Sequence, residues 1–154
     1  MTVHNHEPEN YVCPLCQTAR GLDQDGPWAK RADVIFHDAV VTAFVSPRWW
    51  PNNPGNVVVV PNEHYENVYD IPDDVLHQVQ SAGKRIALAM KQAYKCDGTS
   101  FRQHNEPAGN QEVWHYHLHV FPRYVGDDLY RLKGRNTTPE ERIPYAERLR
   151  ALLT

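Results

Sequence analysis

"WHYHLHVFPR", residues 114–123, carries a histidine at every second position from His115 to His119. Successive side chains of a β-strand point to opposite faces, so His115, His117 and His119 would share one face and the residues between them the other. In a helix the same imidazoles would spread over about 200° of the circumference, at roughly 100° per residue. We therefore predict a strand that turns one face to the core and keeps the histidine face for chemistry.

The size and composition of the chain narrow its class. Its 154 residues are enough for one compact domain with a core and too few for two ordinary domains. A net charge of -3 argues against a protein built mainly to bind nucleic acid. No apolar run approaches the roughly 18 residues of a membrane helix, and the beginning of the chain lacks the pattern of a secretion signal. We expect a cytoplasmic protein that binds neither nucleic acid nor membrane.

Short β-rich runs precede one long helical pattern. Residues 32–46 contain two such runs around a turn at His37 and Asp38, and residues 55–61 predict a third, more buried strand. In residues 72–94 apolar side chains recur at helical spacing, with acidic residues near the start and basic residues near the end. This pattern predicts the main helix.

The second half of the chain returns to strands. Residues 99–105 and 112–123 predict two strands separated by a turn, so the whole order indicates an α+β fold with an antiparallel sheet of about five strands. A helical tail is predicted from Thr138, with Pro139 suited to its first turn and Glu141 three residues after Thr138.

We divide the chain into three parts. The polar beginning has no periodicity and should form a flexible lead-in. The parts are the lead-in at 1–12, the domain at 13–125 and a C-terminal extension of the same domain at 126–154.

The cysteines suggest a metal site. Cys13 and Cys16 form a C-x-x-C motif, while Cys96 stands alone. This pattern is a poor framework for disulfides and is more typical of two of the ligands of a metal site. His64 and His115 would complete the four nitrogen and sulfur ligands that a closed zinc site needs. A redox C-x-x-C normally has a βαβ context, and no strand precedes Cys13. Two ordinary reduced cysteines remain an alternative, and we expect Cys96 to be a small buried residue.

The histidines of residues 115–119 also have alternative interpretations. They could form a histidine-rich surface strand, or all three could bind one metal ion. Side chains at alternate strand positions lie about 6.6 to 6.8 Å apart, which makes convergence on one ion at about 2.0 Å awkward. Separate roles for the three imidazoles suit this spacing better.

The same segment resembles a known family. HYHLHVF, residues 115–121, follows the signature H-φ-H-φ-H-φ-φ of the histidine triad (HIT) superfamily, where φ is apolar and Tyr116 counts as apolar. Residues 105–124 and PGNVVVVPNEH, residues 54–64, resemble further family segments, so the resemblance covers roughly residues 11–125. It implies a HIT-like fold, a homodimer, and nucleotidyl transfer to water through a covalent nucleotidyl-histidine.

The resemblance also implies roles for single residues. His117 would be the nucleophile that attacks the α-phosphorus, and His119 would contact the α-phosphate and the leaving group. Asn105 and Gln111 would hold phosphate oxygens. A neutral imidazole is a good nucleophile near pH 7, with a partner on its other nitrogen to fix the tautomer. In zinc-containing members a structural zinc would be held by the equivalents of Cys13, Cys16, His64 and His115.

The loop after the second strand departs from the family pattern. Ser46 stands where the family often has an acidic residue that binds the ribose, and the loop is lengthened to SPRWWPNNPG. Trp50 or its neighbour Trp49 would offer a stacking surface near the base, because indole faces bind nucleobases well. Packing of the loop or a dimer contact is an equally good interpretation of these tryptophans.

Together these features predict a nucleotide hydrolase or nucleotidyl transferase acting on nucleoside polyphosphates or phosphoramidates. The continuation HVFPRYVGDDL, residues 119–129, resembles the fragile-histidine-triad branch, which favours dinucleoside polyphosphates. The alternatives are a non-catalytic, zinc-containing nucleotide-binding module and a zinc or thiol redox protein based on the C-x-x-C pair. A uridylyltransferase fits less well, because that branch has glutamine at the third triad position, where this chain has His119.

Overall fold

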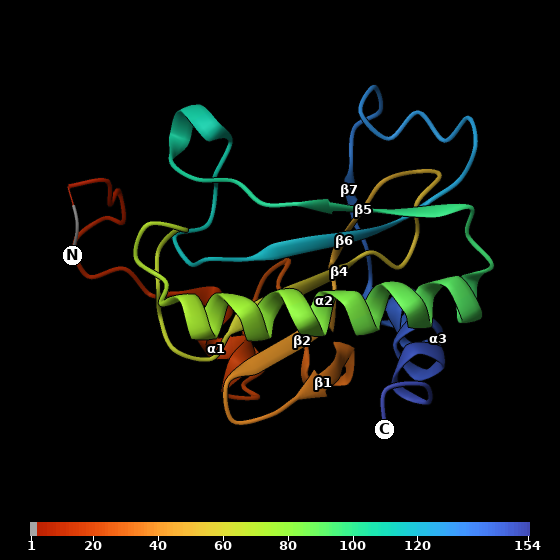
Figure 1. Ribbon diagram of the computed structural model, residues 1–154, viewed down its shortest axis with the longest axis horizontal. Helices are drawn as coiled ribbons and strands as arrows, with labels where there is room; N and C mark the ends of the chain where they lie inside the picture. Colours follow the sequence, from red (N-terminus) through yellow and green to blue (C-terminus); the bar gives the residue numbers. More distant parts are fainter. Residues whose placement is uncertain (1–2) are drawn as a thin grey trace.

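The computed structural model describes residues 3–154 and centres on one antiparallel sheet (Figure 1). The order of its strands is β1-β2-β4-β6-β5, and all neighbours pair antiparallel. The predicted α+β class with a sheet of about five strands is confirmed. The strands are β1 (Val34–His37), β2 (Val41–Val45), β4 (Val57–Pro61), β5 (Gly98–Arg102) and β6 (Leu118–Arg123).

Helix α2 (Asp73–Tyr94) lies across one face of this sheet (Figure 1) and confirms the main helix. Asp73 and Asp74 lie in its first turn, where carboxylates interact favourably with the positive end of the helix dipole. The helix ends at Tyr94, and the residue that caps it, Lys95, adopts a left-handed conformation. Its buried residues pack against the apolar face of the sheet and form the main core.

Strand β6 is shorter than the predicted strand at 112–123. Its ladder with β4 runs from the pair Val57–Val120 to the pair Val59–Leu118, and His115 and His117 precede it. Pro61, at the end of β4, has no N–H to extend the ladder. Residue 116 instead donates its backbone N–H to the carbonyl of residue 65. The alternation nevertheless persists, because Tyr116, Leu118 and Val120 all lie in the core beneath α2.

The opposite face of the sheet carries a continuous row of side chains. Phe44 pairs with Val58, Val58 with His119, and His119 with Arg102. Paired residues of an antiparallel ladder share a face, so the row crosses four strands from β2 to β5. Helix α1 (Pro14–Ala19) packs over the β2 and β4 end of this row through Leu15.

A second, two-stranded sheet was not predicted from the sequence. Strand β3 (Arg48–Trp49) pairs with β7 (Arg135–Asn136) and joins the loop after β2 to the C-terminal extension. Each strand has only two residues, too few to show a periodicity. Thr137 reinforces the contact by donating its N–H and hydroxyl to the carbonyl of Pro47.

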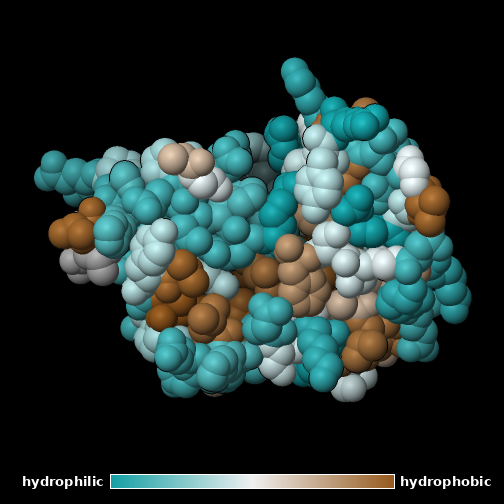
Figure 2. All heavy atoms as spheres, turned by 45° about the horizontal axis from the view of Figure 1, so that its top comes forward, coloured by the Kyte–Doolittle hydropathy of each residue, from teal (hydrophilic) through white to brown (hydrophobic). Residues whose placement is uncertain are grey.

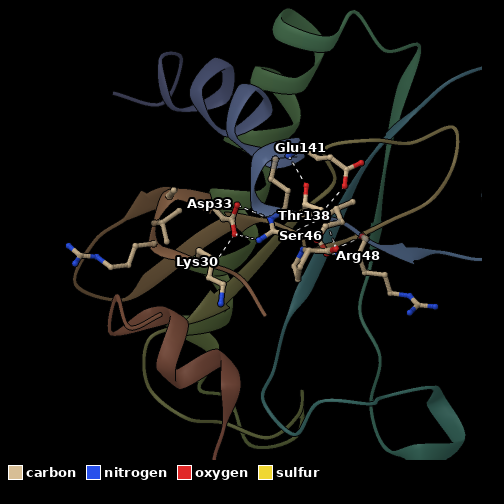
Figure 3. Close-up of polar contacts among 12 residues, drawn as sticks. Lys30, Asp33, Ser46, Arg48, Thr138 and Glu141 are labelled. Atoms are coloured by element: carbon tan, nitrogen blue, oxygen red, sulfur yellow. Dashed lines mark hydrogen bonds and ion pairs between the residues drawn. The ribbon is translucent and has the colours of Figure 1, made fainter. Parts of the chain in front are cut away.

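Helix α3 (Pro139–Arg150) confirms the predicted helical tail. Its capping box joins Thr138 and Glu141, which lie beside each other in Figure 3. Arg142 makes a two-pronged ion pair of 2.9 Å with Asp33, at the end of the 3-10 turn η1 (Arg31–Asp33). Both side chains are almost fully buried, so this contact joins the tail to the start of β1.

The described part of the N-terminal segment, from residue 3 onward, is bound to the rest of the domain. The backbone N–H groups of His6 and Glu7 donate to the carboxylate of the buried residue Glu66 at 2.7 and 2.8 Å. Residues 1–2 of the predicted lead-in lie outside the described residues.

The surface combines hydrophilic and apolar regions. The view in Figure 2 is hydrophilic over its upper part and shows hydrophobic patches lower down. Leu88 on α2 and Phe101 on the edge strand β5 are exposed and line a shared groove. Within residues 3–154, every helix is too short or too polar to cross a membrane.

Candidate active site and metal-binding cluster

The four predicted metal ligands lie together beside helix α1. The ligand atoms of Cys13, Cys16, His64 and His115 are all within 4.8 Å of one another. His115 Nδ1 lies 3.3 Å from the Cys13 sulfur and 3.4 Å from the Cys16 sulfur, and His64 Nδ1 lies 3.4 Å from the Cys16 sulfur. Neighbouring ligands of a tetrahedral zinc ion with bonds of about 2.0 to 2.3 Å are roughly 3.3 to 3.8 Å apart. The cluster therefore has the dimensions of a zinc site.

The tautomers of the two histidines support the same interpretation. His115 Nε2 must donate to the carbonyl of Pro61 at 2.9 Å, and His64 Nε2 contacts the carboxylate of Glu7 at 2.8 Å. The Nδ1 atoms of the two rings lie 3.1 Å apart and face the two cysteine sulfurs. Carbonyl or carboxylate partners on the second nitrogen are typical of metal-bound histidines.

Each thiol of the Cys13 and Cys16 pair affects the acidity of the other. A hydrogen bond with Cys13 lowers the pKa of the Cys16 thiol, and the same bond, together with burial, raises the pKa of Cys13. A divalent cation bound between the two sulfurs would favour two thiolates, the form in which cysteine binds zinc.

A cavity of about 590 Å³ opens over the row of side chains on the face away from α2. Phe44 and Val58 form its apolar end together with Leu15 and Ala29. His119 and Arg102 lie toward the opposite end, with Arg102 three strand spacings, roughly 14 Å, from Phe44. The cavity therefore joins an apolar end to a nitrogen-rich end. Its other lining residues include Trp28, Ser46, Trp50, His104, Asn110 and His117.

His117 lines this cavity with a defined tautomer. Its Nδ1 lies 2.7 Å from the backbone carbonyl of His115, and because a carbonyl can only accept, Nδ1 carries the proton. The lone pair is therefore on Nε2. Burial lowers the pKa of His117 to about 4, so the ring is neutral at pH 7. A neutral imidazole with a fixed tautomer and a free Nε2 can act as a nucleophile.

His119 lies next to His117, with 4.9 Å between the ring centroids. Burial holds its pKa well below the usual value, so it is also neutral. Its Nδ1 is buried and has no hydrogen-bond partner within residues 3–154. An unpaired buried nitrogen beside a cavity is available for a ligand.

The structure brings two of the four predicted substrate-binding residues to the cavity. Ser46 and Trp50 line it, although the Ser46 hydroxyl already bonds the backbone of Arg48 (Figure 3). Trp49 is buried instead and packs edge-on against Tyr145. Of the two tryptophans, Trp50 lines the cavity, and its ring lies against Phe121 and the Arg102 guanidinium.

Asn105 and Gln111 lie outside the cavity lining and hold the loop around the 3-10 turn η2 (Pro107–Gly109). The Asn105 carbonyl oxygen accepts the N–H of Val68, and the Gln111 side chain accepts the N–H of Glu106 and donates to the carbonyl of Glu66. Their amide groups therefore position the loop that carries Asn110 and His104 to the cavity.

Asn110 marks a special backbone position in this loop. Its φ is 69°, a left-handed conformation in which asparagine is tolerated better than most residues. The backbone at this position therefore favours asparagine or glycine.

Arg102 and His104 also line the cavity and were not among the predicted site residues. Both lie in the segment 99–105, where the local pattern predicts a strand. The pairing of Arg102 with His119 places it on the site face, but this register depends on a pairing between distant segments that the local pattern does not specify.

Comparison with known proteins agrees with this architecture: a small α+β domain with paired histidines beside a cavity. Residues 29–126 match the HIT domain. Protein hit of Bacillus subtilis is 33% identical over 123 residues, which span 80% of this chain and 77% of that protein. The chain therefore belongs to the HIT family.

Two further similarities concern function and metal content. An adenosine 5'-monophosphoramidase of Saccharomyces cerevisiae is 34% identical over 73 residues, 47% of this chain and 44% of the yeast protein. A crystal structure of a Zn-bound histidine triad family protein from Mycobacterium smegmatis superposes with a TM-score of 0.74 and 28% identity, covering 92% of both chains.

Proposed function

We propose that the protein is a nucleotide hydrolase or nucleotidyl transferase. It acts at the α-phosphate of nucleoside polyphosphates or phosphoramidates, with dinucleoside polyphosphates preferred, through a covalent intermediate on His117. The observation that carries this proposal is the hydrogen bond from His117 Nδ1 to the carbonyl of His115, which leaves Nε2 as a nucleophile on the cavity. The phosphoramidase activity of the yeast relative supports the reaction class.

The reaction divides into two displacements. His117 Nε2 forms a bond to the α-phosphorus while the bond from phosphorus to the leaving group breaks, and the leaving group keeps the electron pair. Water then attacks the same phosphorus, the P–N bond breaks, and the nucleoside monophosphate and neutral His117 are released. His119, with its unpaired Nδ1, contacts the phosphate and the leaving group.

The nucleoside lies over the apolar end of the cavity in this proposal. Phe44 and Val58 form the surface beneath the base. Trp50 lies against Phe121 and Arg102, toward the leaving-group end of the cavity. Ser46 lies near the ribose. Asn105 and Gln111 contribute by holding the loop before the triad in place.

We further propose that Cys13, Cys16, His64 and His115 bind a structural zinc ion. With four protein ligands, the site would have no open position for water or substrate. The ion would join helix α1 to the triad segment, and the chemistry would remain with the histidines of the cavity.

The test is quenched-flow mass spectrometry of the intact protein with a dinucleoside polyphosphate and, separately, with an AMP phosphoramidate. We expect a transient nucleotidyl adduct that maps to His117. Product release without an adduct would contradict the covalent step.

One observation favours a second candidate, a non-catalytic zinc-containing nucleotide-binding module. Residue 46 is a serine and has no carboxylate to hold a ribose, and its hydroxyl is already engaged with the backbone of Arg48. Binding of AMP without turnover of either substrate would favour this candidate.

The homodimer implied by the family resemblance stays a prediction. Sedimentation equilibrium of the purified protein tests it, and a mass equal to one chain of 17.8 kDa would contradict it.

A further inference from the structure

Arg102 occupies the end of the cavity beyond the histidines. It is the last residue of the edge strand β5, and its cross-strand partner on β6 is His119. Because paired residues share a face, the guanidinium lies on the same side of the sheet as His117 and His119. A group that left the α-phosphorus on the side of His119 would therefore move toward Arg102.

Two aromatic rings hold this guanidinium in place. Its central carbon lies 4.7 Å from the ring centroid of Phe121 and 5.2 Å from that of Trp50. Such stacking restricts the guanidinium to a narrow range of orientations without neutralising its charge. Trp50 therefore positions an arginine as well as lining the cavity.

The charge of Arg102 is unpaired. Within residues 3–154 it has no ion-pair partner, and its Nε is buried without an acceptor. The cavity also contains Glu112, which forms no ion pair with it. By contrast, Arg123 and Arg142 are both paired with carboxylates. A partly buried, unpaired guanidinium is costly in the free protein, and an anionic ligand would remove that cost.

We propose that Arg102 is a specificity-determining residue that binds the phosphate of the leaving group. The protein then favours substrates whose leaving group is an anionic phosphate over substrates whose leaving group is a neutral amine. This inference rests on the proposed function and assigns the selection between its two substrate classes to one side chain.

The chemistry of the two leaving groups explains the selection. When the P–O bond of a polyphosphate breaks, the electron pair stays on an oxygen of the departing phosphate, and its negative charge can be shared with the guanidinium N–H groups. When a P–N bond breaks, the amine takes up a proton from solvent water and departs without negative charge. Arg102 therefore stabilises the first transition state and has no corresponding contact with the second.

The experiment compares Arg102→Gln and Arg102→Lys with the wild type on a dinucleoside triphosphate and on an alkyl phosphoramidate of AMP. Removing a charged hydrogen-bond donor should lower kcat/KM for the triphosphate about ten- to hundredfold. The change for the phosphoramidate should stay within about threefold, because that leaving group lacks the partner charge. Arg102→Lys should fall between these values, because lysine keeps the charge and loses the planar fork.

The matched control is Arg148→Gln. Arg148 also stacks on two aromatic rings, Tyr94 at 5.0 Å and Tyr145 at 4.9 Å, but it lies on helix α3 outside the cavity lining. Its kcat/KM ratio for the two substrates should equal that of the wild type. Equal losses on both substrates in Arg102→Gln, or no loss on either, would overturn the proposal.

A binding measurement separates this proposal from the proposed function. Calorimetry with AMP and with the uncleavable α,β-methylene analogue of ADP gives the affinity gained from a second phosphate without any turnover. Arg102→Gln should reduce this gain about tenfold or more. If the wild type turned over neither substrate, the proposed function would fail, and this affinity ratio would still decide the role of Arg102.

Discussion

The tautomer of His117 is set by the main chain, and its chemistry depends on one free nitrogen. His117→Ala should therefore abolish turnover while AMP binding changes little, because the phosphate-facing His119 and the apolar end of the cavity remain. Steady-state turnover together with calorimetric titration of AMP measures both quantities. Activity close to the wild-type value would exclude the covalent mechanism.

Asp127 shows how one carboxylate organises the turn after β6. It pairs with Arg123 and accepts N–H groups from Tyr124 and Leu129, and the Arg123 guanidinium holds the pKa of this carboxyl well below its usual range. A lowered folded-state pKa stabilises the protein above the unfolded pKa of about 3.9, and this stability is lost as the pH falls through the folded pKa.

Asp127→Asn should consequently lower the free energy of unfolding by about 3 kcal/mol at pH 7, since Asp127 is buried and the pair is broken. The difference from the wild type should shrink below about pH 4, where the carboxylate of the wild type protonates on unfolding. Urea unfolding at several pH values measures this. The exposed neighbour Asp128 provides the control, and a pH-independent difference would contradict the assignment.

The chemical role of a single residue could be inferred from the sequence only where a local pattern indicated that role. Alternation alone separated His115, His117 and His119 from their apolar neighbours, and the spacing of Cys13 and Cys16 indicated a metal site. The contacts of Asn105 and Gln111 with the distant segment 66–68 depend on the folded chain, and no local pattern reports them. For the same reason, no local pattern identified Arg102, whose place in the site depends on its pairing with His119.

Secondary-structure elements followed the sequence closely where they are long. The main helix and the hairpin of β1 and β2 arise from strong periodicity and turn signals. The start of β6 depends on Pro61 of β4, which has no N–H to extend the ladder between the two strands. Strands β3 and β7 are defined only by their pairing with each other. Elements that are defined by a partner are therefore the ones that local patterns miss.

Helix α3 is attached to the sheet by a buried charge pair, and this attachment can be tested. Asp33→Ala should lower the free energy of unfolding by about 3 to 5 kcal/mol, because it leaves Arg142 buried and unpaired. The double variant Asp33→Leu with Arg142→Met should recover most of the loss, since it removes both charges together. Chemical denaturation measures both. Equal losses in the single and double variants would show that packing, and not the unpaired charge, is responsible.

Viewed as a whole, the molecule assembles its cavity from distant parts of the chain. The apolar end comes from residues 15–58, the histidines from 117–119, and one wall from the extension through Asn136. The proposed zinc ligands likewise include Cys13 and His115, which are 102 positions apart in the sequence. The family resemblance could name several of these residues in advance, whereas their arrangement required the paired strands.

Cys13→Ser tests how far the proposed zinc ion holds these parts together. Zinc content per chain should fall and the melting temperature should decrease, because metal binding contributes directly to folding free energy. Metal analysis and thermal unfolding measure the two effects. Cys96→Ser is the control, since Cys96 is buried outside the cluster. Unchanged zinc content in Cys13→Ser would refute the ligand assignment.

Residue 115 serves two sites through different chemical groups. Its ring lies among the proposed zinc ligands, while its carbonyl accepts the hydrogen bond from His117 Nδ1. The carbonyl belongs to every amino acid, so an exchange of the ring for another side chain would keep the acceptor of His117 Nδ1. The two features of this position are therefore genetically separable, and the proposed metal site can diverge in evolution without a change in the tautomer of residue 117.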